Sequence, residues 1–258
     1  MKVLYVVSGA SFLSSHPWRK REAIVRCWRG LGHEVELICG GDILSPYRRK
    51  QMEHGYADRS RLSWYRRKAL LAPFVNSVSE MVNLLHDRRL AGVVTRKIAE
   101  FRPDLYWQRS SRLDGLTLAA AHRSGIPTVL EWKDHILSLY GVSLLKPYAA
   151  WVERQKERKS DFVVVESGVL REQLAVFRRD GSDSILVAHN AIDPAEFEVT
   201  RGEEHSDLRS RAGVPSESFC AIFVGSFAYY HRVELLVEAV AKARPRSARP
   251  IHAVLVGD

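Results

Sequence analysis

The sequence predicts an α/β fold, with a doubly wound, Rossmann-like N-terminal domain followed by an incomplete second domain of the same kind. Three observations support this prediction. Short apolar runs alternate with helical patterns over residues 2–188, as expected for a mostly parallel sheet. The same alternation restarts at residue 219, and the hydrophobic share of 46% is large enough for a globular core.

The first three elements form a strand–helix–strand unit. Residues 2–7 predict a buried strand, residues 17–31 a helix and residues 34–39 a second strand. The helix has apolar residues at helical spacing, namely Ile24, Cys27, Trp28 and Leu31. Gly32 ends the helix. The order strand, helix, strand predicts a right-handed βαβ crossover, the founding element of a doubly wound fold.

The rest of the N-terminal domain continues the alternation. Further strands are expected at 105–108, 128–131, 161–165 and 184–188. Helices are expected from 73 towards 90 and on through 101, then at 113–123, 144–159 and 169–177. Ser167 is the predicted N-cap of the last helix, because its hydroxyl can accept from a free backbone N–H of the first turn.

The C-terminal part predicts the opening of a second domain. We expect domains at 1–197 and 218–258, joined by a linker at 198–217. The second domain should contain a strand, a helix and a strand, at 219–224, 233–240 and 251–256. A parallel sheet needs several strands and cover on both faces. We therefore expect this unit to be incomplete, with its apolar strands covered by a partner chain or in a dimer.

The net charge of +9 favours an anionic partner, although solvated basic surfaces are the alternative. No zinc finger, recognition helix or aromatic RNA-binding motif accompanies the charge, so we expect no nucleic-acid partner. No run of about 18 uncharged apolar residues predicts a membrane-spanning helix. Cys27, Cys39 and Cys220 show no metal-binding spacing, which favours a reducing, cytoplasmic location.

The loop after the first strand lacks the G-x-G-x-x-G fingerprint, which argues against a dehydrogenase. Ligands of doubly wound sheets bind beyond the carboxyl ends of the strands. Gly9 would permit close backbone approach there, and His16 and Arg19 near the helix start are candidate substrate contacts. An ordinary polar loop is the alternative.

A second group of candidates follows the strand at 128–131. Glu131, Asp134 and His135 gather at its carboxyl end, on the same edge of the sheet as Gly9. Carboxylate and imidazole groups there could orient a substrate hydroxyl or accept its proton, so we treat these three as catalytic candidates. A solvated loop held by an ion pair, to Lys133 or to a distant arginine, is the alternative.

The second domain opens with a glycine turn before a helix. Free backbone N–H groups and the helix dipole favour a phosphate at such a position. The candidate phosphate-binding residues are Gly225, Ser226, His231 and Arg232. Plain topology, without any ligand, explains the turn equally well.

Residues 45–72 are strongly basic. The stretch 48–68 includes Arg48, Arg49, Lys50, Arg59, Arg61, Arg66, Arg67 and Lys68. With the apolar residues that follow, it predicts a peripheral contact with an anionic membrane, at the inner face of the cytoplasmic membrane. The preferred alternative is that those apolar residues, Phe74, Val78, Met81 and Leu85, pack on the sheet.

Four ordered motifs resemble the GT-B glycosyltransferases, specifically the retaining group called family 4. The motifs are 32–35 (GHEV), 163–167 (VVVES), 189–197 (HNAIDPAEF) and 223–236 (FVGSFAYYHRVELL). The resemblance covers essentially the entire chain. It implies transfer of a sugar from a nucleotide-sugar to a glycan or lipid-linked acceptor, in the synthesis of cell-surface polysaccharides.

The same resemblance implies roles for the candidate residues. The acceptor would bind the N-terminal domain at Gly9, His16, Arg19 and Asn190, and the donor diphosphate would bind the second domain at Gly225. Stabilising the leaving diphosphate is the main electrostatic task, and the family implies no bound metal and no cofactor beyond the nucleotide-sugar itself.

The chain departs from the family pattern at several positions. Ala191 and Arg232 replace glycines, Ala228 replaces a lysine, and Ser226 stands where many members have a phosphate-binding arginine. The acidic E-x7-E segment of the family lies beyond residue 258. We therefore expect little activity from this chain alone, and a non-catalytic, acceptor-binding subunit of a split transferase is the alternative function.

Overall fold

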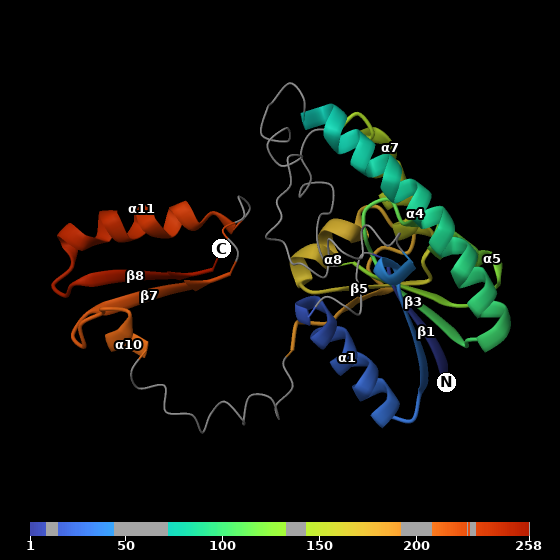
Figure 1. The fold of residues 1–258 in the computed structure, drawn as a ribbon, viewed down its shortest axis with the longest axis horizontal. Coiled ribbons are helices and arrows are strands. Elements are labelled where there is room, and N and C mark those ends of the chain that lie inside the picture. The colour runs from blue at the N-terminus through green and yellow to red at the C-terminus, as the bar shows by residue number, and fades with distance from the viewer. Residues whose placement is uncertain are drawn as a thin grey trace. The chain divides into compact units, whose positions relative to one another are not determined.

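The computed structural model describes residues 1–8, 15–43, 72–132, 143–191, 208–225, 227 and 231–257. The chain divides into two compact units, Met1–Ala191 and Ile192–Asp258 (Figure 1). Each unit is described by itself below.

The first unit contains a six-stranded sheet of order β2-β1-β3-β4-β5-β6, and every neighbouring pair is parallel. Its strands are β1 (Lys2–Val7), β2 (Glu34–Cys39), β3 (Leu105–Arg109), β4 (Thr128–Glu131), β5 (Phe162–Val165) and β6 (Ile185–Val187). Each strand lies within a residue or two of its predicted position. The α/β class and the parallel sheet are thereby confirmed.

Helices cover both faces of this sheet. They are α1 (Ser15–Gly30), α4 (Ala72–Phe101), α5 (Gly115–Arg123), α7 (Lys146–Lys159) and α8 (Gly168–Ala175), with a short 3₁₀ helix η1 (Gly40–Ile43) after β2. Successive side chains of a strand point to opposite faces, so Tyr5 packs with Val25 of α1, whereas Leu4 packs with Leu90 of α4. Figure 1 shows α1 on one side of the sheet and α4 and α5 on the other.

Two helix starts show how local chemistry sets the boundaries. Ser167 caps α8 as predicted, since its hydroxyl accepts from the backbone N–H of Leu170 at 3.3 Å. Helix α5 begins two residues later than predicted. Leu113 has a φ of 66°, which is not helical, and Asp114 is the N-cap residue.

Helix α4 corrects one expectation. It is a single helix of 30 residues. Its C-terminal half packs on the sheet through Leu90, Val94, Ile98 and Phe101. The preferred interpretation of Phe74, Val78, Met81 and Leu85, that they pack on the sheet, is wrong because these side chains are 59 to 62% exposed. The inward face of the N-terminal half of α4 is formed by Ser77, Glu80 and Leu84 instead.

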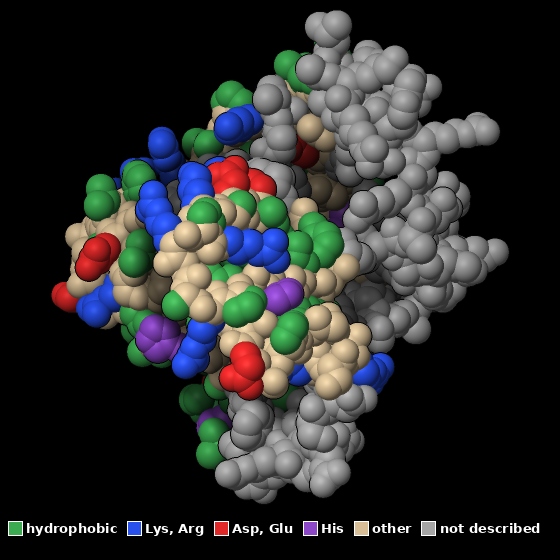
Figure 2. All heavy atoms as spheres, turned by 90° about the vertical axis from the view of Figure 1, so that its left-hand side faces the viewer, with side chains coloured by type: hydrophobic (Ala, Val, Ile, Leu, Met, Phe, Trp, Pro, Cys, Tyr) green, Lys and Arg blue, Asp and Glu red, His purple; other side chains and the backbone are tan. Residues whose placement is uncertain are grey.

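The second unit contains the two-stranded parallel sheet of β7 (Phe219–Val224) and β8 (Ile251–Val256). Between these strands lie α11 (Val233–Ala243) and the 3₁₀ helix η3 (Arg244–Arg246), and α10 (Leu208–Arg211) precedes them. None of the residues of α11 is buried. Both strands carry exposed apolar side chains, among them Ile222 and Val224 of β7. Figure 2 shows apolar and basic side chains side by side on the face turned to the viewer.

Candidate functional site

The order of the first sheet creates a switch point between β1 and β3. The chain leaves β1 towards β2 on one side and returns to β3 on the other. Ligands of doubly wound sheets bind beyond the carboxyl ends of the strands at such a point. Here this edge is formed by Ser8 after β1, by Arg109 at the end of β3 with residues 110–114 after it, and by Glu131 at the end of β4.

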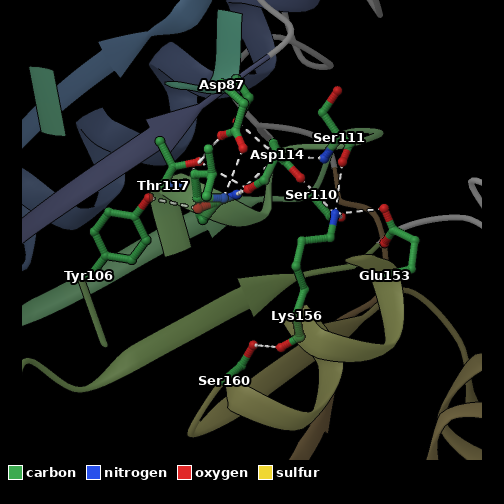
Figure 3. Close-up of polar contacts among 12 residues, drawn as sticks. Asp87, Tyr106, Ser110, Ser111, Asp114, Thr117, Glu153, Lys156 and Ser160 are labelled. Carbon is green, nitrogen blue, oxygen red and sulfur yellow. Dashed lines mark hydrogen bonds and ion pairs between the residues drawn. The ribbon is translucent and has the colours of Figure 1, made fainter. Parts of the chain in front are cut away.

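On the α5 side of this edge, the carboxylate of Asp114 is the centre of a hydrogen-bond network (Figure 3). Its Oδ2 accepts from the hydroxyl of Ser8 at 2.8 Å, from Nε2 of Gln108 at 2.9 Å and from the backbone N–H of Ser111 at 2.8 Å. Its Oδ1 lies 2.6 Å from Nζ of Lys156. Asp114 thereby joins the ends of β1 and β3 to helix α7.

Lys156 is fully enclosed, with 1% of its side chain exposed. Its Nζ donates to Oγ of Ser110 at 2.7 Å and to the backbone O of Ser111 at 2.8 Å, and it lies 2.8 Å from Oε1 of Glu153. Burial by itself lowers the pKa of Lys156, but the adjacent Asp114 and Glu153 carboxylates outweigh burial and the pKa is raised. Lys156 is therefore a permanent cation that holds the loop after β3 in place.

Asp87 of α4 occupies the N-terminus of α5. Its carboxylate accepts from the backbone N–H of Leu116 at 2.8 Å and from the hydroxyl of Thr117 at 2.9 Å. Burial and the nearby Asp114 raise the pKa of Asp87 to about 6. An anion from the chain itself thus satisfies the free N–H groups of this helix, so this helix start is not open to a substrate phosphate.

On the α1 side of the same edge, Glu131 has a partner for each carboxylate oxygen. Oε2 accepts from the hydroxyl of Tyr5 at 3.1 Å and from Nε1 of Trp107 at 3.3 Å, and Oε1 lies 2.9 Å from a guanidinium nitrogen of Arg109. The side chain of Glu131 is 8% exposed and that of Arg109 is 27% exposed. The rings of Trp28 and Trp107 pack beside this group, with centroids 4.9 Å apart.

A second arginine adds positive charge near Glu131. Arg21 of α1 is buried, and its pKa is lowered by burial first and by Arg109 next. Burial is also the main cause that raises the pKa of Tyr5, with Glu131 the second cause, so the phenol stays neutral and donates. Among the described residues, two guanidinium groups beside one carboxylate leave the α1 side of this edge net positive, and Arg109 is its more exposed cation.

The position of Glu131 corrects part of the sequence interpretation. Glu131 is not in a solvated loop, since it is buried. The ion pair to a distant arginine, which the alternative interpretation anticipated, is present as Arg109–Glu131. With both oxygens engaged by Tyr5, Trp107 and Arg109, the Glu131 carboxylate is placed to orient the Arg109 guanidinium.

Of the other N-terminal candidates, Asn190 alone has a described side chain. Gly9, Asp134 and His135 lie outside the described residues, as does the stretch 48–68, and the side chains of His16 and Arg19 in α1 are not described either. Asn190 is exposed beyond the end of β6, which lies three strands from β3 in the sheet.

In the second unit, three of the four phosphate-binding candidates are described. Gly225 has a φ of 155°, and a Cβ there would lie 3.3 Å from the ring of Phe223 and 4.0 Å from Nδ1 of His231. Arg232, the N-cap of α11, has a φ of 50°, and its Nε lies 2.5 Å from Oε1 of Glu234. Ser226 lies outside the described residues.

Residues 17–191 match the profile of the Glycosyl transferase 4-like domain. The chain belongs to this family. The match spans most of the first unit and contains the part of the carboxyl edge that is formed by residues 109–114 and Glu131, whereas β1 and Ser8 precede it.

Individual proteins show the same relationship. Over 85 residues the chain is 29% identical to an uncharacterised glycosyltransferase of Methanocaldococcus jannaschii. These 85 residues cover 33% of this chain and 22% of that protein. It is similar in structure to a glycosyltransferase of Rickettsia africae, with a TM-score of 0.57 and 17% identity, over 99% of this chain and 60% of that one. It is also similar to HepE of Anabaena in complex with UDP, with a TM-score of 0.53 and 14% identity, over 100% of this chain and 61% of that one.

These structural matches confirm the predicted GT-B type of fold. The chain spans about 60% of the solved structures that it resembles and 22% of the curated relative. Within the described part of this family member, no cluster of three or more His, Cys, Asp or Glu residues is arranged to hold a metal ion. No helix of the described part has the length and apolar character needed to cross a bilayer.

Sequence reasoning missed most of the network around Glu131 and Asp114. Gln108 ends a predicted strand and Arg109-Ser110-Ser111 follow it directly, so the rule that selected Glu131 would have selected them too. Lys156 carried no such signal, because a lysine within a basic helix predicts a solvated surface.

Proposed function

We propose that this chain is the acceptor-binding part of a retaining glycosyltransferase that transfers a sugar from a nucleotide-sugar to a glycan or lipid-linked acceptor. The observation that carries the proposal is the family match over residues 17–191, which includes the polar residues 109–114 and Glu131 of the carboxyl edge of the first sheet. A role in the synthesis of cell-surface polysaccharides, at the inner face of the cytoplasmic membrane, belongs to the same proposal.

The acceptor site is proposed at the carboxyl edge of β1, β3 and β4. Of the residues described at this edge, Arg109 is the accessible cation and would donate to acceptor oxygens, while Glu131 holds its guanidinium in place. Glu131 is thus a positioning residue in this proposal, and Asp134 and His135, which follow it in sequence, are the candidates for direct contact with the acceptor hydroxyl. Gly9, His16, Arg19 and Asn190 are the remaining proposed acceptor contacts.

The donor diphosphate is proposed to bind at the start of α11. Gly225 keeps the backbone accessible, and Ser226, His231 and Arg232 would surround the phosphates. The Arg232–Glu234 pair is exposed on both sides, so exchanging Glu234 for a phosphate costs little. HepE of Anabaena was solved with UDP, which supports a nucleoside diphosphate as the ligand class. No metal ion and no cofactor beyond the donor are part of the proposal.

The test is a transfer assay with the full-length protein and a panel of nucleotide-sugars, using membrane lipid extracts as acceptors. We expect transfer of one labelled sugar into the lipid fraction, and saturable binding of the matching nucleoside diphosphate in titration calorimetry. Absence of both transfer and nucleotide binding across the panel would overturn the proposal. Transfer that appears only after a second polypeptide is added would establish the alternative of a split transferase.

A further inference from the structure

The outer surfaces of α4 and α7 combine exposed apolar side chains with basic ones. The four apolar residues of α4 that were expected on the sheet, Phe74, Val78, Met81 and Leu85, recur at helical spacing and are exposed. On α7, Tyr148 and Trp151 are exposed, with ring centroids 5.7 Å apart and stacked, and Leu144, two residues before the helix, is exposed as well. We call these seven residues, with the groove between the helices, the α4–α7 face.

A groove joins the two helices into one surface. It has a volume of about 240 Å³, and Leu84 of α4, Leu116 of α5 and the pair Tyr148 and Trp151 of α7 contribute to its lining. Leu84 also packs against the buried Ala149 and Val152 of α7. The apolar surface therefore continues from α4 across α5 to α7.

The charges of α4 and α7 are sorted by sign. Both carboxylates of α7, Glu153 and Glu157, are buried. Of the three carboxylates of α4, Glu80 and Asp87 are buried. Glu80 pairs with Arg112 and Glu153 pairs with Lys156, so these acids serve buried cations. The exposed charged side chains of α7 are all basic, and so are those of α4 before its last turn. They are Arg88, Arg89 and Arg96 on α4, and Lys146, Arg154, Arg158 and Lys159 on α7.

We propose that the α4–α7 face binds an anionic lipid surface. Exposed aliphatic side chains can enter the headgroup boundary, while tryptophan and tyrosine favour that interface because their rings are partly polar. Lysine and arginine on the same face attract anionic headgroups. A surface with aromatic, aliphatic and basic side chains, and with its acids turned inward, matches this partner in both polarity and charge.

This inference deepens the proposed function, because a membrane-bound acceptor would lie at the same surface. The sequence pointed to residues 48–68 together with the apolar residues that follow them. The inference keeps those apolar residues of α4 and adds the exposed side chains of α7 and the basic residues of both helices. Its test needs no sugar transfer, so the two proposals fail independently.

The test is co-sedimentation of the full chain with phosphatidylcholine vesicles that contain or lack phosphatidylglycerol. We expect binding only to the anionic vesicles, weakened as salt rises from 0.05 to about 0.5 M because salt screens the basic residues. The double variant Val78→Asn/Leu85→Asn should bind at least about tenfold more weakly. Arg88→Gln should weaken binding about fivefold. All three side chains are exposed, so the fold should remain intact.

Matched controls lie elsewhere on the first unit. Leu31 beyond the end of α1 is 73% exposed, and Leu31→Asn should leave vesicle binding unchanged. Arg171→Gln on α8 is the control for Arg88→Gln, because it removes one exposed charge from another helix.

Three results would overturn the proposal. One is equal binding of the wild type and the Val78→Asn/Leu85→Asn variant, and another is absence of binding to anionic vesicles. The third is a concentration-dependent dimer in analytical ultracentrifugation that the same double variant abolishes, since a second copy would then occupy the face.

Discussion

Nζ of Lys156 in α7 lies 2.6 Å from Oδ1 of Asp114, the residue that precedes α5, and both side chains are almost completely buried. This ion pair joins residues that are 42 positions apart in the sequence. Asp114 also binds Ser8 and Gln108, so the pair links α7 to the ends of two adjacent strands. The shape of the carboxyl edge of the first sheet therefore depends on a contact made between helices.

Substituting Lys156→Met should destabilise the first unit by about 3 to 5 kcal/mol, because it leaves buried carboxylates without their cation. Urea unfolding followed by circular dichroism measures this loss. Lys159→Met, at an exposed position of the same helix, is the control and should change the free energy of unfolding by less than about 0.5 kcal/mol. Equal stability of the two variants would show that the buried pair is not a structural lock.

Substituting Glu131→Gln in the full-length enzyme should raise the KM for the acceptor about tenfold, because Arg109 loses the charge that orients it. The value of kcat should stay within about threefold, since Tyr5 and Trp107 can still donate to the amide oxygen. Steady-state kinetics with varied acceptor separates the two constants.

Glu36→Gln is the matched control, because its carboxylate pairs with Lys97 in the middle of β2 rather than at the carboxyl edge. A fall of kcat by about 100-fold or more in Glu131→Gln, with KM unchanged, would instead assign Glu131 to proton transfer.

The stability of the first unit should depend on pH through Glu157. Burial, and then the charge of Glu153, raise the pKa of Glu157 to about 7 from its ordinary value of 4.5, although Lys156, Arg154 and Arg178 oppose the shift. Between these two values the folded state binds more protons than the unfolded state. The contribution to stability is therefore complete below pH 4.5 and is lost as the pH rises through 7.

The variant Glu157→Gln should remove this dependence, because glutamine stays neutral. We expect it to be more stable than the wild type by on the order of 3 kcal/mol at pH 8, and by about 1 kcal/mol at pH 5. Urea midpoints at the two pH values measure the difference, with the exposed Glu172→Gln as control. A gain that is the same at both pH values would contradict the assigned cause.

Two variants of Arg232 separate backbone strain from charge. Its φ of 50° costs about 1 to 2 kcal/mol for a residue with a Cβ, and glycine avoids this cost. Arg232→Gly should therefore stabilise the second unit relative to Arg232→Ala by about 1 kcal/mol, as measured by thermal unfolding. Both variants should weaken binding of a nucleoside diphosphate equally, by about tenfold, because both lack the guanidinium.

If Arg232→Ala and Arg232→Gly unfold at the same temperature, the left-handed backbone at this position stores no strain. Nucleotide affinity that both substitutions leave intact would remove Arg232 from the proposed phosphate site.

The sequence alone determined the positions of the strands and the family. Apolar runs such as residues 2–7 and 219–224 are bounded by glycine, proline or polar residues, and this pattern is a local property of the chain. The cap at Ser167 is equally local, since its hydroxyl needs a partner only three residues away.

Tertiary structure alone decided the partners of Glu131 and Asp114, and which face of α4 is buried. Glu131 meets Tyr5 only because β1, β3 and β4 are adjacent, and sheet order is not contained in any local pattern. Helical spacing shows that Val78 and Leu85 share a face, but it does not show whether that face meets the sheet or the solvent. That choice is made by packing against α7 and the segments that precede α5 and α7, because Glu80 pairs with Arg112 and accepts from Ser143 while Leu84 packs against Ala149 and Val152.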